Sequence, residues 1–449
     1  VEPGDGAGPA LIELQVGSMA AGGGCVARDG RGRVVFIRHA LPGEVVLAAI
    51  TSESRSFARA DAVTVLEGSP DRVAPPCPHA GPGRCGGCDF QHVALPTQRS
   101  LKAALVAEQL RRLTGIERTL KVEALPGDRD GLGWRTRVGF AVDAGGRVGL
   151  RRHRSHAVEA VAACPLASPG VEDLGIEARL WPGVAGVEAA ASADGTQAVV
   201  SLVSARPRGG SGRSGGPGDS RAAGGGSGGG SGRHGIPAVA DELPPGVGLV
   251  VDGRVDRAPP GISHAVLGRR FEVPAGVFWQ VHPGAPAALG EAVLSGLEPA
   301  PGDRVADLYA GAGLFTALLA QAVGEAGRVI AIEGDRAAAR AAARNTADQP
   351  QVRVRTAPVT PSLVVTGLDR PDLVVLDPPR AGAGPAVARA LGRTRPRRLV
   401  YVSCDPASLA RDLRVFLDGG WAIVRLRAFD AFPMTEHVEL VAVLQPPSL

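Results

Sequence analysis

Two side chains in the last 50 residues have the types needed for covalent catalysis. Cys404 directly follows the apolar run RLVYVS, and Glu439 opens the apolar run ELVAVL. A cysteine at the end of a buried strand is more often an apolar filler than a nucleophile. A carboxylate that enters an apolar strand is costly to bury unless it has a task or a partner. If the fold brings the two together, Cys404 is the candidate nucleophile and Glu439 the candidate general base.

A second group of residues predicts a cofactor site. The run DLYAGAG ends an apolar strand before a helix, and Gly311 and Gly313 let a ligand approach the backbone at that helix N-terminus. Thr316 stands where a dinucleotide fingerprint needs its third glycine, which argues against NAD or FAD. Glu333 ends the next strand, 20 residues after Gly313, where a carboxylate accepts both hydroxyls of a ribose. The pattern favours an adenosine-type cofactor over a purely structural turn.

A third acidic position follows the apolar run DLVVL. Asp377 is followed by Pro378, Pro379 and Arg380, and the prolines end the strand and stiffen the loop. In adenine-amino methylases a related Asp-Pro-Pro turn is followed by an aromatic residue that stacks on the target base. Because Arg380 occupies that position here, methylation of an adenine amino group is the lesser interpretation.

A thiolate, a carboxylate and a methyl donor are together what methylation of an unactivated pyrimidine carbon requires. C5 of uracil is too weak a nucleophile to accept a methyl group unaided. Addition of the Cys404 thiolate to C6 produces an enolate whose C5 attacks a sulfonium methyl group. Removal of the C5 proton by Glu439 then allows the thiolate to leave.

Six motifs carry a family resemblance. GVFWQVHPGA, DLYAGAGLF, VIAIEGD, LDPPR, VSCDP and FPMTEHVE occur in this order and resemble those of the uracil-5 RNA methyltransferases that act on ribosomal and transfer RNA. The resemblance implies Cys404 as the nucleophile and Glu439 as the base. Asp405 stands where asparagine is common and Met434 where a polar residue is frequent, departures that bear on substrate choice more than on reaction type. The S-adenosylmethionine contacts that the resemblance implies are Gln280, Tyr309, Glu333 and Asp377.

Four cysteines predict a metal centre. Cys77, Cys85 and Cys88 fall within 12 residues of one loop, and Cys164 follows 76 residues later. Four thiolates suit a tetrahedral zinc or a cubane iron–sulfur cluster. Three clustered ligands and one remote cysteine favour the cluster, and the family resemblance implies a 4Fe-4S centre. Seven residues between Cys77 and Cys85 keep zinc as the alternative. Cys25 fits neither site and is expected to be a buried filler.

The chain is expected to divide into three parts of α/β class. Residues 9–68 read as short alternating strands of an OB-like β-barrel, which resembles the RNA-binding TRAM domain. Residues 69–270 are assigned to a central α+β domain with the metal cluster; its helix 96–115 is expected to pack on the catalytic domain, and 206–235 is a Gly- and Ser-rich disordered insertion. Residues 271–449 alternate strands and helices, as in a doubly wound class I methyltransferase sheet.

The net charge of +4 is no argument for an RNA partner, because the 206–235 segment alone carries five Arg and one Asp. The argument rests on arginines concentrated elsewhere. Phe90, Trp134 and Phe278 are the candidates for stacking on bases. The candidate phosphate contacts are Arg135, Arg137, Arg147, Arg151, Arg152 and Arg154, with Arg28, Arg31, Arg33, Arg38 and His39 in the N-terminal strands.

No apolar run of about 18 residues is present, and the first residues lack the layout of a signal peptide. We therefore expect a cytoplasmic enzyme that binds RNA and no membrane, a monomer with no protein partner implied. The function predicted is methyl transfer from S-adenosylmethionine to C5 of a uridine in ribosomal or transfer RNA. The alternatives are an RNA methyltransferase that acts on another base atom and a catalytically inactive RNA-binding or chaperone protein.

Overall fold

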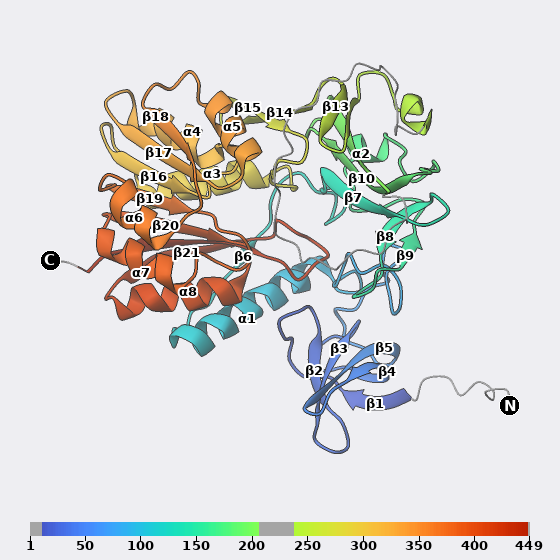
Figure 1. Cartoon of the computed structure of the whole chain (residues 1–449). Coiled ribbons are helices and arrows are strands. Elements are labelled where there is room, and N and C mark those ends of the chain that lie inside the picture. The colour runs from blue at the N-terminus through green and yellow to red at the C-terminus, as the bar shows by residue number, and fades with distance from the viewer. Residues whose placement is uncertain (1–10, 206–237, 448–449) are drawn as a thin grey trace, which may run out of the picture.

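The structure is a computed structural model that describes residues 11–205 and 238–447. The insertion expected at 206–235 lies outside the described residues. The described residues form four sheets, and Figure 1 shows the largest of them beside the central strands, with the N-terminal strands below. None of the helices in these two ranges is long and apolar enough to cross a membrane.

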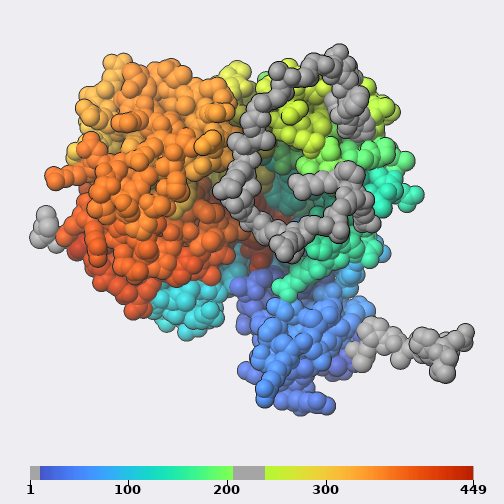
Figure 2. All heavy atoms as spheres, in the orientation of Figure 1, coloured from blue at the N-terminus to red at the C-terminus, as the bar shows by residue number. Residues whose placement is uncertain are grey.

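The N-terminal part is a five-stranded sheet in the order β1-β4-β5-β3-β2. Buried and exposed positions alternate along β3 and β4, as expected when one face packs on a core. Among the described residues no pairing joins β1 to β2, so the sheet is not closed into a barrel by hydrogen bonds. Figure 2 shows this part as a lobe that projects below the rest of the molecule and adjoins it. Its strands are β1 (Leu11–Gln15), β2 (Cys25–Arg28), β3 (Val34–Arg38), β4 (Val45–Glu53) and β5 (Phe57–Glu67).

Helix α1 (Leu95–Thr114) follows the cysteine-rich loop and packs against α8 (Pro406–Asp418). It starts with a proline in its first turn and ends at Gly115, whose φ of 75° gives the left-handed cap that glycine adopts without strain. Its buried face is not purely apolar. Gln98, Lys102 and Gln109 are buried there together with Leu105, Val106 and Leu110.

The central part is a seven-stranded sheet in the order β13-β12-β11-β10-β7-β8-β9, followed by the hairpin β14–β15. A short helix, α2 (Pro169–Glu172), and the 3-10 helix η1 (Ala238–Glu242) accompany it. Its strands are β7 (Arg137–Val142), β8 (Val148–Arg151), β9 (Val158–Ala160), β10 (Val184–Ala191), β11 (Ala198–Ser204), β12 (Gly248–Val251) and β13 (Arg254–Arg257), and the hairpin is β14 (Gly261–Val266) and β15 (Arg269–Pro274).

The C-terminal part is an eight-stranded sheet in the order β18-β17-β16-β19-β20-β22-β21-β6. The strands from β18 to β20 are parallel, and β22 runs antiparallel between β20 and β21. The outermost strand, β6 (Val122–Glu123), comes from the chain before the central sheet. The other strands are β16 (Arg304–Leu308), β17 (Arg328–Glu333), β18 (Val352–Thr356), β19 (Leu373–Leu376), β20 (Arg398–Ser403), β21 (Ala422–Phe429) and β22 (Glu439–Gln445).

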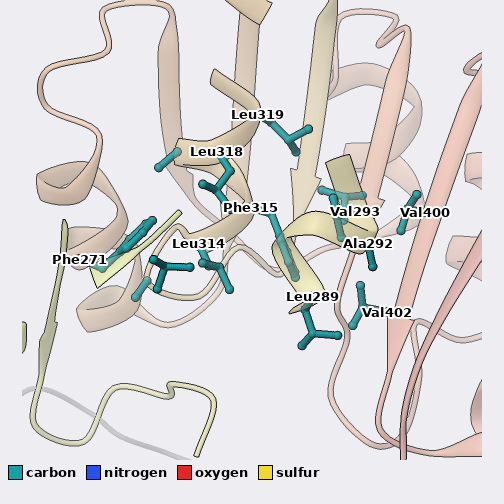
Figure 3. Close-up of a cluster of buried hydrophobic side chains, with 14 of the residues drawn as sticks. Phe271, Leu289, Ala292, Val293, Leu314, Phe315, Leu318, Leu319, Val400 and Val402 are labelled. Carbon is teal, nitrogen blue, oxygen red and sulfur yellow. The ribbon is translucent and has the colours of Figure 1, made fainter. Parts of the chain in front are cut away.

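Helices cover both faces of this sheet, as a mostly parallel sheet requires. One face packs on α3 (Ala285–Leu297), α4 (Leu314–Val323) and α5 (Arg336–Asn345) through a core that includes Leu289, Phe315 and Val400 (Figure 3). The other face packs on α6 (Pro361–Gly367), α7 (Pro385–Thr394), α8 and α1. The carboxyl ends of β16, β17, β19 and β20 therefore meet at one edge, where ligands of such sheets bind.

Candidate active site

Cys404 follows β20 and lines a cavity of about 170 Å³. Arg380 and His437 line the same cavity from the loops after β19 and before β22. Another wall comes from the N-terminal part, where Ala21 and Gly22 precede β2. Two lobes of the chain therefore enclose the space in front of the candidate nucleophile.

Glu439 is the first residue of β22, the antiparallel neighbour of β20, in which Ser403 is paired with Leu440. This register places Glu439 beside Cys404, as expected from their positions at the ends of apolar segments. Only 3% of Glu439 is exposed. Burial, reinforced by the charge of Asp377 and opposed by that of Arg380, raises the pKa of Glu439 well above its usual value.

The electrostatics of Cys404 keep its thiol protonated. Burial first, and then the charge of Glu439, raise the pKa of Cys404 to about 11, while Arg380 acts in the opposite direction. Nη2 of Arg380 lies 3.2 Å from Nε2 of His437. Burial and the charge of Arg380 lower the pKa of His437 to about 4, so its imidazole is neutral near pH 7. The cavity thus holds the protonated thiol of Cys404 and the guanidinium of Arg380.

The loop between β16 and α4 has the backbone expected for close approach of a ligand. Tyr309, Gly311 and Gly313 all have positive φ angles, of 63°, 55° and 90°. A Cβ on Gly313 would lie 3.1 Å from Cα of Ala342, so a side chain there would collide with α5. Glu333 accepts hydrogen bonds from the backbone N–H of Gly311 at 2.8 Å and from that of Asp335 at 2.7 Å. These bonds fix its carboxylate and leave lone pairs for further donors.

Asp307, at the end of β16, is a site residue that the sequence analysis missed. It is fully buried, and Thr316 Oγ1 donates to its Oδ2 at 2.5 Å. Its other oxygen, Oδ1, has no hydrogen-bond partner within the described residues. Burial raises the pKa of Asp307 to about 7, and burial together with the charge of Asp307 raises that of Asp377. An unpartnered carboxylate oxygen at this edge fits a cationic ligand such as the ammonium group of S-adenosylmethionine.

Gln280 lies away from the Cys404 cavity. It lines a separate cavity of about 220 Å³ between the β10–β11 turn, β14 and the start of α3, together with His264 and Asp194. His264 stacks on Trp279 with ring centroids 5.0 Å apart. The structure thus brings Cys404, Glu439 and Asp377 into one electrostatic group, while Gln280 borders the neighbouring junction.

The four cysteines predicted as a metal site line one small cavity of about 20 Å³. Burial raises the pKa of Cys88 to about 12 and also raises those of Cys85 and Cys164. Gln91 Nε2 donates to Cys88 Sγ at 3.3 Å. Over the described ranges, no group of three or more histidine, cysteine or acidic side chains is arranged to hold a metal ion. The four cysteine thiols thus line one cavity, and the metal centre stays a prediction.

The structure corrects part of the predicted RNA surface. Phe90 and Trp134 were expected to stack on bases, but they are 1% and 0% exposed, so that prediction is wrong. Trp134 instead stacks on His282 and meets Phe432 edge-on in the core. Phe278 is 66% exposed and remains available.

Several of the candidate arginines are paired with carboxylates inside the chain. These pairs reduce the number of free phosphate ligands. They are Arg33 with Asp29 and Glu53, Arg38 with Asp89, Arg137 with Glu188, and Arg152 with Glu159.

Three family models match parts of this chain. The family model of tRNA (uracil-5-)-methyltransferase matches residues 369–446, which carry Cys404 and Glu439, and the TRAM domain model matches 12–63. A third model, protein-L-isoaspartate (D-aspartate) O-methyltransferase, matches 282–358, which include the glycine loop.

Relatives match over almost the whole chain. An uncharacterized RNA methyltransferase of Streptomyces coelicolor is 46% identical over 97% of this chain and 92% of its own length. The 23S rRNA (uracil(1939)-C(5))-methyltransferase RlmD of Halomonas elongata is 32% identical, with 97% and 89% covered. The structure of Pyrococcus abyssi tRNA (uracil-54, C5)-methyltransferase with S-adenosyl-L-homocysteine has a TM-score of 0.68 at 20% identity, covering 96% of this chain and 100% of that one. At that identity the likeness shows the fold.

The sheet order and the glycine loop are those of a methyltransferase-like fold, and the relatives that match almost the whole chain are named as RNA methyltransferases. With relatives above 30% identity over nearly all of both chains, the protein belongs to the uracil-5 RNA methyltransferase family.

Proposed function

We propose that this protein transfers a methyl group from S-adenosylmethionine to C5 of a uridine in RNA, with Cys404 as the nucleophile and Glu439 as the base. The observation that carries the proposal is the placement of Glu439 at the start of β22, next to the strand that ends at Cys404. Burial raises the pKa of Glu439, which favours it as a proton acceptor for a carbon acid.

The reaction follows from the groups at this edge of the sheet. The thiol of Cys404 first loses its proton to solvent water. Its Sγ, now the thiolate, bonds to C6 of the uracil, and the electron pair of the C5=C6 double bond shifts toward C5 and O4. When bound, S-adenosylmethionine supplies the electrophilic methyl group that C5 takes up. A carboxylate oxygen of Glu439 accepts the C5 proton, the double bond reforms, and the bond from C6 to sulfur breaks to return the thiolate.

Arg380 has a role in this scheme that the sequence motif alone did not assign. Its charge lowers the pKa values of both Cys404 and Glu439. It therefore favours the thiolate against the effect of burial, and from the same cavity it would stabilise the negative charge that develops on a bound uracil during the adduct stage. Loss of Arg380 should slow adduct formation more than it weakens RNA binding.

The cofactor would lie along the carboxyl ends of β16, β17 and β19. Gly311 and Gly313 would leave room for it, and Glu333 would accept the ribose hydroxyls. Asp307 Oδ1, buried without a partner in the part of the chain that the structure describes, supports an ammonium contact at the same edge. Gln280, Tyr309 and Asp377 complete the proposed set, with Gln280 reaching from the adjoining junction.

The substrate proposed is ribosomal or transfer RNA, with ribosomal RNA to be tested first because a relative at 32% identity is named for 23S rRNA. In this scheme residues 9–68 form a TRAM-like RNA-binding domain. Residues 69–270 form the central domain, and residues 271–449 the methyltransferase domain.

The cysteine site is proposed to hold a 4Fe-4S cluster, with zinc as the alternative. Support comes from the four thiols that line one cavity, Cys77, Cys85, Cys88 and Cys164. A bound centre would organise this loop, because methyl transfer needs no electron. Iron, acid-labile sulfide and zinc contents of anaerobically purified protein distinguish the two, and Cys164→Ala should lose the bound metal.

The decisive experiment maps 5-methyluridine in total RNA from a deletion strain and repeats the reaction with purified protein. Loss at one uridine names the substrate, whereas an unchanged map contradicts the proposal. Cys404→Ala should give neither product nor a covalent RNA adduct, and Cys25→Ala, in the N-terminal core, is the matched control. Turnover by Cys404→Ala would favour a methyltransferase for another base atom. Failure of the wild-type protein to methylate any RNA would favour an inactive binding protein.

A further inference from the structure

The loop that leads into Glu439 contains a backbone turn that needs outside support. Met434 has a φ of 66°, a left-handed backbone conformation that residues other than glycine adopt only when their surroundings hold them there. The loop joins β21 to β22, and Glu439 starts β22 five residues after Met434. Any relaxation of this turn would shift the residues that follow it.

Gln98 supplies that support from α1. Its side chain is fully buried, and its Oε1 accepts a hydrogen bond from the backbone N–H of Met434 at 2.9 Å. Its Nε2 donates to the carbonyl oxygens of Phe90 at 3.1 Å and Val93 at 2.9 Å. One amide thus connects the catalytic loop with the end of the cysteine-rich segment, although 336 residues separate Gln98 from Met434.

The carbonyl of Met434 is held by the same segment. It accepts hydrogen bonds from the backbone N–H groups of Asp89 and Phe90, both at 3.0 Å. These residues directly follow Cys88, whose thiol lines the cysteine cavity. Both polar backbone groups of Met434 are therefore bound by residues far away in the sequence, and the left-handed turn is set by Gln98 and the segment after Cys88.

The contacts continue from this turn into the active-site cavity. The N–H of Glu436 donates to Asp89 at 3.3 Å, and its carboxylate accepts from the N–H of Gly22 at 2.5 Å. The next residue, His437, lies against Arg380 in the Cys404 cavity. The turn at Met434 therefore sets the position of a run of residues that ends at Glu439.

We propose that Gln98 is a positioning residue for proton removal: it holds Met434 in its left-handed turn and so places Glu439 against C5 of the bound uridine. The inference rests on the proposed function and adds to it a residue that does not touch the substrate. The Lys102–Asp430 pair anchors α1 to the other end of the loop independently, so replacement of Gln98 leaves α1 docked.

The test replaces Gln98 with leucine, which removes the hydrogen bonds and keeps the site filled. In Gln98→Leu, the bond from Cys404 Sγ to C6 forms and C5 is methylated, but the C5 proton is accepted slowly. Methylated RNA should accumulate as a covalent adduct, and kcat should fall by about tenfold to a hundredfold, within the range that a general base contributes. KM for S-adenosylmethionine should stay within about twofold of the wild-type value, because the substitution changes no contact with the cofactor.

A second substitution separates positioning from general damage. Glycine adopts the left-handed conformation without strain, so Gln98→Leu/Met434→Gly should accumulate less adduct and keep a higher kcat than Gln98→Leu. Both values are compared with those of Met434→Gly, which accounts for the loss of the buried Met434 side chain. Gln349→Leu is the matched control, because Gln349 is a buried glutamine whose Nε2 donates to Ala317 far from this loop. If Gln98→Leu does not fold, Gln98→Met is measured in its place.

Normal turnover by Gln98→Leu overturns the inference. So does a loss of kcat without adduct accumulation or without recovery in the glycine double variant, because that pattern describes a purely structural role. A wild-type protein that forms neither adduct nor 5-methyluridine overturns the proposed function itself. The two failures are therefore distinguished by the wild-type reaction measured in the same assay.

Discussion

The buried ion pair between α1 and the catalytic loop gives the sharpest stability prediction. Lys102 Nζ lies 2.6 Å from Asp430 Oδ1, and their side chains are 0% and 1% exposed. Lys102 also donates to the carbonyl oxygen of Phe432 at 2.9 Å, and Arg99 contacts the other oxygen of Asp430 at 3.1 Å. Lys102→Met would leave a buried carboxylate with Arg99 as its single cation.

The expected magnitude follows from these contacts. Removing one partner of a buried pair costs about 3–5 kcal/mol, because the remaining charge stays desolvated. Since Arg99 still faces Asp430, Lys102→Met should lie near the lower end, about 3 kcal/mol. Lys102→Met/Asp430→Leu removes both charges and one hydrogen bond to the Phe432 carbonyl, which still accepts from Thr435, at a cost of about 1 kcal/mol. The double variant should therefore be more stable than the single one.

Amide hydrogen exchange read by mass spectrometry measures this local effect better than global unfolding of a chain with several sheets. Peptides from α1 and from residues 430–438 should exchange about a hundredfold faster in Lys102→Met, and peptides from β1 to β5 should not change. The reasoning is refuted if Lys102→Met exchanges like the wild type, or if the double variant exchanges at least as fast as the single one.

Three further predictions follow from the site. The pKa of Cys404 is raised to about 11, so little thiolate is present at pH 7.5. Alkylation of Cys404 by iodoacetamide at this pH, without RNA, should therefore be roughly a hundredfold slower than alkylation of an ordinary thiol. A rate typical of a free cysteine would contradict the raised pKa. Burial raises the pKa of Asp307 from 3.8 to about 7, so its favourable contribution is complete below pH 3.8 and is lost as the pH rises through about 7. Asp307→Asn should flatten the pH dependence of the melting temperature across that window, and an unchanged slope would argue against it. Gly313→Ala, with φ of 90° and its new Cβ 3.1 Å from Ala342, should weaken S-adenosylmethionine binding at least about tenfold by calorimetry, whereas equal affinity would refute the need for glycine.

The parts of this protein that were predictable are those with local patterns. The alternation of apolar strands and helices after residue 271 carries the doubly wound sheet, and the position of Cys404 and Glu439 at strand ends follows from the same pattern. The sequence pattern cannot predict β6, because this strand is only two residues long and is defined by its pairing with β21. A strand of that length exists through its partner alone.

The polar residues that position the site had no local signal. Gln98 and Lys102 lie on a helix face that the spacing of leucines marks as apolar, and their partners in the catalytic loop come more than 300 residues later. Trp134 was expected to contact RNA because arginines surround it, yet packing against His282 and Phe432 buries it. Asp307 stood inside a recognised motif, but only the three-dimensional structure separates its bonded oxygen from its unpartnered one.

The placement of α1 and β6 has a consequence for synthesis of the chain. β6 pairs with Ala428 and Phe429, and the partner of Lys102, Asp430, lies 328 residues further along the chain. At about 5–20 residues per second, roughly 15–65 s pass on the ribosome between the two. During that interval the α1 face that will be buried is exposed, and the charge of Lys102 and the amide of Gln98 keep it hydrated. The polar side chains that contact the catalytic loop in the folded protein thus make this face less apolar while it is exposed.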